Sequence, residues 1–307
     1  MSSNQKTITY SAIAGLTLAA ILLFPDRIEK ITADQVVVEF KDPFADIALQ
    51  AKSVYVYDSA TKEVLYAENE NASMPLASIA KIMTAITAAD LAPKGTVVTI
   101  TSEALQKEGD SGLYGDEQWL LDELLRFSLV VSSNDGMAAI AAALGSHEQD
   151  ITFDISRGDF VKKMNTKAAL LGYPSLVFNN ETGLDESTTT AGAYGSAKDT
   201  ALLLEYAMNK YGDIMHSTRY QNSSFSSLSK LNHYAANTDE IAGTIPGLIA
   251  GKTGFSDLAG GNLAVVFDAG LQHPVVVVVL GSTYDGRFTD IQKIISAVIA
   301  KLSYSAV

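Results

Sequence analysis

The order in which strand-like and helix-like patterns follow one another is the feature that most restricts how this chain can fold. Residues 53–58 and 63–69, SVYVYD and EVLYAEN, alternate along their length and are joined by the short polar stretch 59–62. This arrangement predicts a β-hairpin. Clear strand patterns return only after Pro246, in LIAGKTGFS, GNLAVVFDAG and HPVVVVVLGS.

Between these two groups of strands, residues 102–208 indicate mainly helix. Segments such as DEQWLLDELLRFSLVVSS, DFVKKMNTKAALLGY and SAKDTALLLEYAMNKYG repeat apolar side chains at helical spacing. A last helix is expected from Phe288 to Leu302. Strands first, helices in the middle, and strands plus a helix last predict an α+β fold. In it the two ends build one antiparallel sheet flanked by helices, and a mostly helical subdomain is inserted beside it.

The N-terminal region predicts a membrane segment. Residues 8–24 form a run of 17 residues without a charge, followed directly by Pro-Asp-Arg. That length suits a signal peptide or a short membrane span. Because the run lacks small residues at a cleavage position, we favour a retained anchor over a cleaved signal that would leave a secreted protein. Residues 1–7 are then a cytoplasmic stub, residues 25–50 a linker, and residues 51–305 an extracytoplasmic domain.

Composition excludes several classes of function. The net charge of −13 argues against nucleic-acid binding, which needs clustered Lys and Arg. The chain has no cysteine, so thiolate metal sites and disulfides cannot form. The 4 histidines are scattered outside any motif. We therefore expect neither a metal nor a cofactor.

A Ser-x-x-Lys motif is the first candidate for catalysis, but it is common in this chain. It occurs at Ser3/Lys6, Ser59/Lys62, Ser78/Lys81 and Ser227/Lys230. Three copies fall in the N-terminal tail, in the predicted hairpin turn and in a serine-rich polar stretch. Only Ser78 and Lys81 lie on an apolar helical segment, where positions i and i+3 share a face.

A serine hydroxyl becomes a nucleophile when a base takes its proton, and a lysine can be that base only if its pKa is lowered. Such a site therefore needs a second positive group and a proton relay. VVSSNDG supplies Ser132 and Asn134 at a break between helices, and IAGKTGFS supplies Lys252, Thr253 and Gly254 on a strand.

Each of these residues also has a structural explanation. Ser132 and Asn134 could cap the helix that follows them. The Lys-Thr-Gly stretch could be ordinary strand and turn chemistry. Arg287, in GSTYDGR, could belong to a surface ion pair.

Taken in order, the three motifs resemble the set shared by the penicillin-recognising serine enzymes. Ser-x-Asn follows Ser-x-x-Lys by 54 residues, and Lys-Thr-Gly follows 120 residues later. Within that group the chain is similar to the low-molecular-mass penicillin-binding proteins, the serine-type D-alanyl-D-alanine carboxypeptidases. The similar stretches include PLASIAKIMTA, FSLVVSSNDGMAA, NETGLDESTTTAGAYGSAKDTALL and IPGLIAGKTGFSDLAGGNLAVV. The resemblance implies a β-lactamase/transpeptidase-like fold from Lys52 to about Leu302.

The resemblance also implies catalytic roles. Ser78 would be the nucleophile that the substrate acylates, and Lys81 would take its proton. Ser132 would relay that proton to the leaving group. Lys252, which the resemblance places among the substrate-binding residues, would hold the field that keeps Lys81 partly neutral.

Further residues are implied in substrate binding. Asn134 would hold the substrate amide, while Thr253, within the Lys-Thr-Gly strand that ends at Gly254, would bind the terminal carboxylate. The backbone N–H groups of Ser78 and Phe255 would form an oxyanion hole. Arg287 would help to bind the carboxylate.

The implied activity is removal of the last D-alanine from peptidoglycan stem peptides that end in D-Ala-D-Ala, with β-lactam antibiotics as covalent inhibitors. Residues 160–185 contain no Glu-x-x-Leu-Asn, and the nearest match, ETGLD at 181–185, ends in Asp. Efficient antibiotic hydrolysis is therefore not expected. Alternatives are a D,D-endopeptidase, a weak β-lactamase of the same fold, and a catalytically idle wall-binding or sensor domain.

Overall fold

Strands from the two ends of the chain pair with each other, as the order of patterns predicts. The computed structural model describes residues 41–146, 151–270 and 272–305. The predicted membrane segment, residues 8–24, lies outside them. Within the described ranges, no helix is long and apolar enough to cross a membrane.

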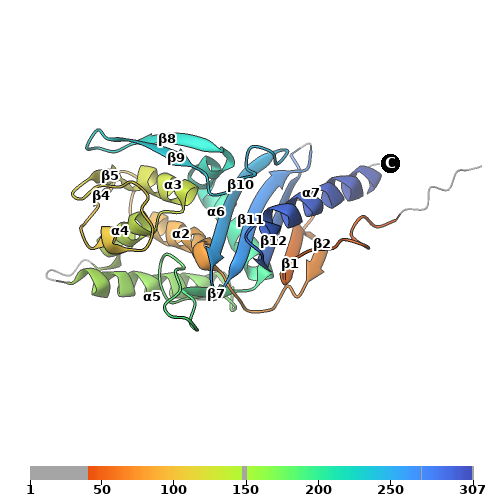
Figure 1. Cartoon of the computed structure of the whole chain (residues 1–307), viewed down its shortest axis with the longest axis horizontal. Helices are drawn as coiled ribbons and strands as arrows, with labels where there is room; N and C mark the ends of the chain where they lie inside the picture. The colour runs from red at the N-terminus through yellow and green to blue at the C-terminus, as the bar shows by residue number, and fades with distance from the viewer. Residues whose placement is uncertain (1–40, 147–150, 271, 306–307) are drawn as a thin grey trace, which may run out of the picture. The chain divides into compact units, whose positions relative to one another are not determined.

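One antiparallel sheet of five strands forms the centre of the fold (Figure 1), in the order β10-β11-β12-β1-β2. Its strands are β1 (Ser53–Asp58), β2 (Glu63–Glu68), β10 (Leu248–Ser256), β11 (Gly260–Asp268) and β12 (Pro274–Ser282). β1 pairs with β12, so that Val56 lies opposite Val277. The predicted hairpin and the predicted C-terminal strands are therefore confirmed as parts of one sheet.

Both faces of this sheet are covered, which explains the unbroken apolar run in β12. Val276, Val278 and Leu280 belong to the core beneath the helical part of the chain. Val275, Val277 and Val279 face the other way, into a core shared with the C-terminal helix α7 (Gly286–Ser305). Figure 1 shows α7 lying across the sheet. On the opposite face the sheet packs against α6 (Ala197–Met215).

The inserted part of the chain is mainly helical but also contains short strands. Its helices are α2 (Lys81–Leu91), α3 (Leu121–Val131), α4 (Asn134–Gly145) and α5 (Phe153–Leu171). Its strands are β3 (Met74–Pro75), β4 (Val97–Thr99), β5 (Gln118–Leu120), β6 (Val177–Phe178), β7 (Ala193–Gly195), β8 (Asn222–Ser226) and β9 (Asn232–Ala236). Strands of two or three residues are too short to show alternation, so the sequence pattern missed those within 102–208. The helix predicted for DEQWLLDELLRFSLVVSS is wrong at its start, because Gln118–Leu120 pairs with β4 as strand β5 and α3 begins only at Leu121.

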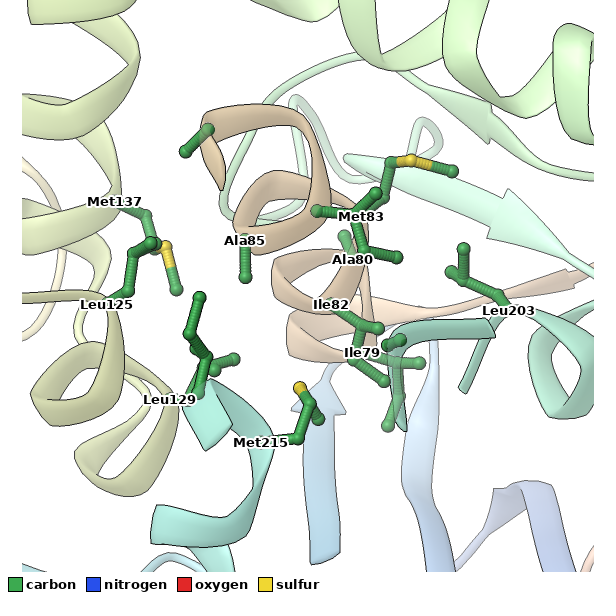
Figure 2. Close-up of a cluster of buried hydrophobic side chains, with 14 of the residues drawn as sticks. Ile79, Ala80, Ile82, Met83, Ala85, Leu125, Leu129, Met137, Leu203 and Met215 are labelled. Atoms are coloured by element: carbon green, nitrogen blue, oxygen red, sulfur yellow. The ribbon is translucent and has the colours of Figure 1, made fainter. Parts of the chain in front are cut away.

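Helix α2 passes through the middle of the helical core. Its residues 81–88 are all buried. Figure 2 shows Leu125 and Leu129 of α3 and Met137 of α4 on one side of it, and Leu203 of α6 on the other. Fully burying one such side chain contributes about 1.5–3 kcal/mol. The segment that carries Ser78 and Lys81 is therefore held on a rigid support.

Residues 42–50, at the end of the predicted linker, pack against the sheet and α7. The Phe44 ring stacks on Tyr66 with the ring centroids 5.1 Å apart. The backbone N–H groups of Gln50 and Ala51 donate to the buried carboxylate of Asp290 on α7. These contacts fix the start of β1.

Candidate active site

Ser78 and Lys81 are brought together by a change of helix type. Ser78 lies in a 3₁₀ turn, η2 (Ala77–Ala80), and Lys81 is the first residue of α2. Side chains three residues apart eclipse each other in a 3₁₀ turn. Ser78 Oγ and Lys81 Nζ are consequently 2.7 Å apart.

The other described copies of the motif have structural surroundings. Ser59 and Lys62 lie in the turn between β1 and β2, and both contact the carboxylate of Glu205. Ser227 and Lys230 lie in the turn between β8 and β9, with Lys230 at a φ of 64°. Neither pair has a lysine buried beside its serine.

Lys81 is placed so that its amine can accept a proton. Its side chain is 0 % exposed, and Nζ donates to Asn134 Oδ1 at 2.7 Å and to the backbone carbonyl of Thr182 at 2.8 Å. Burial lowers the pKa of Lys81 well below its usual range, and the nearby charge of Lys252 lowers it further. A neutral amine has two N–H groups, which these two carbonyls can take. Its lone pair then faces the Ser78 hydroxyl.

The break between α3 and α4 presents Ser132 and Asn134 to the two lysines. Ser132 ends α3 in the left-handed conformation, with a φ of 60°. The cap of α4 is Ser133, which accepts from the Gly136 N–H at 2.8 Å. The capping interpretation of Ser132 and Asn134 is therefore wrong. Asn134 Nδ2 donates to the Glu108 carbonyl at 2.7 Å, which turns its Oδ1 toward Lys81.

Lys252 is the second buried lysine of the cluster, and it lies on β10. Its Nζ donates to Ser132 Oγ at 3.0 Å, and the side chain is 1 % exposed. Burial lowers the pKa of Lys252 to about 7, and the positive charge of Arg287 contributes in the same direction. Each of the two lysines thus contacts one serine hydroxyl, Lys81 that of Ser78 and Lys252 that of Ser132.

Gly254 allows β10 to approach the turn that carries Ser78. A Cβ at this position would lie 2.6 Å from the Leu76 carbonyl oxygen, which is closer than real Cβ contacts come. Buried Asn262 of β11 ties the same segment down by donating to the carbonyls of Pro75 at 2.9 Å and Leu76 at 3.1 Å. A side chain at Gly254 would therefore push the strand away from the nucleophile.

An open cavity of about 260 Å³ lies beside Ser78. Ser132, Thr253, Phe255 and Arg287 line it. Of these residues, Phe255 is 49 % exposed to solvent. The cavity thus joins the nucleophile to Thr253 and Arg287, which the sequence predicts to bind substrate, whereas Asn134 and Lys252 are not among its lining residues.

Arg287 is buried in the wall of this cavity. It is 3 % exposed, which contradicts its interpretation as a surface ion-pair partner. Its Nη1 donates to the Gly254 carbonyl at 3.0 Å, and its guanidinium carbon lies 4.2 Å from the ring centre of Tyr284. The guanidinium therefore places a fixed positive charge beside the end of β10.

Sequence reasoning missed two contributors to this site. The Thr182 carbonyl that accepts from Lys81 is a backbone group, and no residue type announces it. Its neighbour Glu181 is fully buried in an ion pair with Arg157, at 2.8 Å. Asn262 has no motif of its own. Among the described residues, no cluster of His, Asp and Glu side chains is arranged to hold a metal ion.

The geometry suits acyl transfer by an activated serine. A hydroxyl in contact with a buried amine of lowered pKa is a nucleophile with its base. A second serine and a second buried lysine can carry the proton onward. The cavity offers positive charge where a substrate anion would lie.

Comparisons with known proteins point the same way. A family model described as D-alanyl-D-alanine carboxypeptidase matches residues 39–283. The D-alanyl-D-alanine carboxypeptidase DacF of Bacillus subtilis is 29% identical over 257 residues, which is 82% of this chain and 62% of the relative. A D-alanyl-D-alanine endopeptidase of Haemophilus influenzae is 29% identical over 220 residues, 70% of each chain.

The fold also has solved counterparts. Penicillin-binding protein D2 of Listeria monocytogenes, in its cefotaxime-bound form, matches with a TM-score of 0.69 and 24% identity, over 82% of this chain and 98% of that one. Such a likeness shows that the fold is shared.

Proposed function

The chain belongs to the D-alanyl-D-alanine carboxypeptidase family, and from this premise we propose that it removes the terminal D-alanine from peptidoglycan stem peptides. The reaction proceeds through an acyl-enzyme on Ser78. The observation that carries the proposal is the 2.7 Å contact between Ser78 Oγ and the buried amine of Lys81. An idle binding domain would have no need for a buried, desolvated base beside a serine.

Acylation follows from this geometry. Ser78 Oγ attacks the carbonyl of the penultimate D-alanine and gives its proton to Lys81. The bond between carbonyl carbon and nitrogen then breaks, and the leaving D-alanine nitrogen receives a proton through Ser132. Water hydrolyses the ester and restores the Ser78 hydroxyl. Backbone N–H groups at Ser78 and Phe255 stabilise the oxyanion.

β-Lactam antibiotics acylate the same serine in this proposal. The fold relative with cefotaxime bound supports it. Glu181, the glutamate of the ETGLD stretch, is held by Arg157 and lines another cavity than the one beside Ser78. It is therefore not free to activate a deacylating water, so the adduct persists and the antibiotic acts as an inhibitor.

The two lysines set the pH range of acylation. Lys81 must be neutral, so the rate rises with pH as the Lys81–Lys252 pair loses its first proton, below the pKa of free lysine. Lys252 must stay cationic to attract the substrate carboxylate, so the rate falls again when it deprotonates. The profile is a bell with an acid limb and an alkaline limb.

Arg287→Ala tests recognition of the free C-terminal carboxylate. A charge-assisted contact contributes about 1.5–3 kcal/mol net, so kcat/KM for a free-acid D-Ala-D-Ala peptide should fall roughly ten- to a hundredfold. The C-terminal amide of the same peptide makes no such contact and should lose little. Steady-state hydrolysis of both peptides by both enzymes measures the difference.

The same comparison separates carboxypeptidase from endopeptidase. Wild-type enzyme that cleaves acid and amide equally, or a variant that loses both equally, would contradict carboxylate recognition by Arg287. The endopeptidase alternative, which the Haemophilus influenzae relative makes pertinent, would then gain.

We propose further that residues 8–24 anchor the protein in the cell membrane, with the catalytic domain on the extracytoplasmic side. The uncharged run of 17 residues and the unsuitable sequence after it support this proposal. The intact mass of protein extracted from membranes should include these residues. A mature N-terminus between Asp26 and Asp34 would instead establish a cleaved signal and a secreted enzyme.

A further inference from the structure

Asp239 is a buried carboxylate that the proposed mechanism does not use. It follows β9 in the chain and is 1 % exposed. Its Oδ1 accepts from the Ile241 N–H at 3.2 Å. Its Oδ2 is buried and, among the residues that the structure describes, has no hydrogen-bond partner. An unpartnered carboxylate oxygen in the interior is costly unless a nearby charge compensates for it.

The Oδ2 atom of Asp239 lies against Gly251 of β10, the residue before Lys252. A Cβ on Gly251 would come 3.2 Å from Asp239 Oδ2, so the absence of a side chain there gives the carboxylate its place. The preceding residue, Thr238, lines the cavity and hydrogen-bonds the Thr253 hydroxyl at 2.6 Å. Both residues that flank Asp239 in the chain, Thr238 and Glu240, thus line the cavity.

Two buried cations act on this carboxylate: Lys252, which directly follows Gly251 in β10, and Arg287. Lys252 donates to Ser132 Oγ and the Thr253 carbonyl, and Arg287 donates to the Gly254 carbonyl. Within the described ranges, neither cation hydrogen-bonds a carboxylate. Burial raises the pKa of Asp239 to about 6, while Arg287 and Lys252 act to lower it.

Other charged groups around Asp239 are at the surface. Glu240, its neighbour, is exposed and bonds the Tyr284 hydroxyl at 3.0 Å. His216 and Arg219, on the turn η4 (His216–Arg219) that packs against β10, are exposed as well. Of the two charged groups that act on the pKa of Lys252, Arg287 and Asp239, Asp239 is the anion. The buried carboxylate of Asp135 accepts from Ser111 Oγ and acts on Lys81 instead.

We propose that Asp239 is the counter-charge of the carboxylate-binding end of the cleft, a positioning residue that keeps Lys252 cationic without touching substrate. The inference rests on the proposed function, because Lys252 matters only if it receives a substrate anion and sets the state of Lys81. Asp239 acts through space, across the backbone of Gly251.

This role predicts a specific change in the pH profile. Removing the negative charge of Asp239 lowers the pKa of Lys252, because an opposite charge favours the protonated amine. The alkaline limb of acylation then moves to lower pH. The acid limb reports the pKa of Lys81, and Asp239 is not among the groups that shift that pKa. The acid limb should therefore stay at its wild-type pH, or move slightly upward if Lys252 loses its charge and no longer lowers the pKa of Lys81. The bell becomes narrower.

The experiment measures the second-order rate of acylation by a fluorescent penicillin between pH 5 and pH 10. Asp239→Asn keeps the shape of the side chain and removes its charge. Its alkaline limb should move down by about one pH unit. Asp239→Glu restores the charge and should return the limb to its wild-type position, even if the rate is lower throughout. Asp257→Asn is the control, because it removes an exposed carboxylate that directly follows β10, the strand of Lys252. The alkaline limb of this variant should stay at its wild-type pH.

Thermal unfolding provides a check that does not depend on activity. The folded pKa of Asp239, about 6, is above the ordinary 3.8, so its ionisation costs stability as pH rises through this range. Asp239→Asn should therefore raise Tm relative to wild type more at pH 8 than at pH 4.

The outcomes separate the two proposals. A wild-type bell with an unmoved alkaline limb in Asp239→Asn, or a uniform loss of rate at every pH, would overturn the role of Asp239 and leave the proposed function intact. A wild-type protein that penicillin does not acylate would overturn the proposed function and, with it, this inference.

Discussion

Replacing Lys81 by methionine is expected to lower the rate of Ser78 acylation by about 10²- to 10⁴-fold, the usual contribution of a general base. Methionine fills nearly the same space in the core but cannot take a proton. The Lys81 amine is the base nearest to Ser78 in the described site, at 2.7 Å. Stopped-flow acylation by a penicillin and hydrolysis of a D-Ala-D-Ala peptide should both show the loss.

The chain offers a matched control for this substitution. Lys62 stands at the same spacing from Ser59, but its side chain is 59 % exposed in a surface turn. Lys62→Met should keep wild-type kinetics. Loss of Nζ leaves Asn134 Oδ1 and the Thr182 carbonyl without the amine that donates to them, so the folding of Lys81→Met has to be checked. Circular dichroism provides that check. A folded Lys81→Met enzyme with wild-type acylation would contradict the assignment of the base.

Ser78→Ala is expected to have the largest effect, because no covalent intermediate can form without the hydroxyl. Peptide hydrolysis should fall by at least about 10⁴-fold, to what binding and the oxyanion site provide alone. The covalent penicillin adduct should disappear completely. Ser78 is only partly buried and packs no apolar group into the core, so the variant should unfold at a temperature near that of wild type.

The matched control is Ser59→Ala, in the surface copy of the motif. It should hydrolyse the peptide and form the adduct as wild type does. Retained labelling in Ser78→Ala, or lost labelling in Ser59→Ala, would place the nucleophile elsewhere.

Much of the fold can be predicted from the spacing of apolar residues along the chain. SVYVYD and the apolar run PVVVVVL form strands with both faces covered, and the structure pairs them as neighbours. The helices of the inserted block follow equally well from their spacing. Strands such as β4 and β5 could not be predicted, because three residues form a strand only when a distant partner pairs with them.

The sequence predicts which residues form the candidate site, but it does not predict how their side chains are arranged. Ser78, Lys81, Ser132, Asn134 and Lys252 stand in three motifs, and the structure brings all of them together. Their roles stay predictions until they are tested. The sequence could not show which serine caps α4, because Ser132 and Ser133 are adjacent and of one type. The left-handed conformation of Ser132 decides it.

The burial of charged residues is the property of the site that is hardest to predict from the sequence. Arg287 and Asp239 are of a type normally found at the surface. Their burial depends on β10, α7 and the segment after β9 meeting at one place, which is a long-range property. The pKa of Lys252, about 7, depends on the same packing.

Mass spectrometry of the penicillin-labelled protein tests the central claim most directly. The protein is labelled, digested, and its peptides are searched for the mass of the adduct. The account predicts one labelled peptide, containing MPLASIAK, with the adduct on Ser78 and none in Ser78→Ala. An adduct on Ser59 or Ser227, or a protein that remains unlabelled while correctly folded, would contradict it.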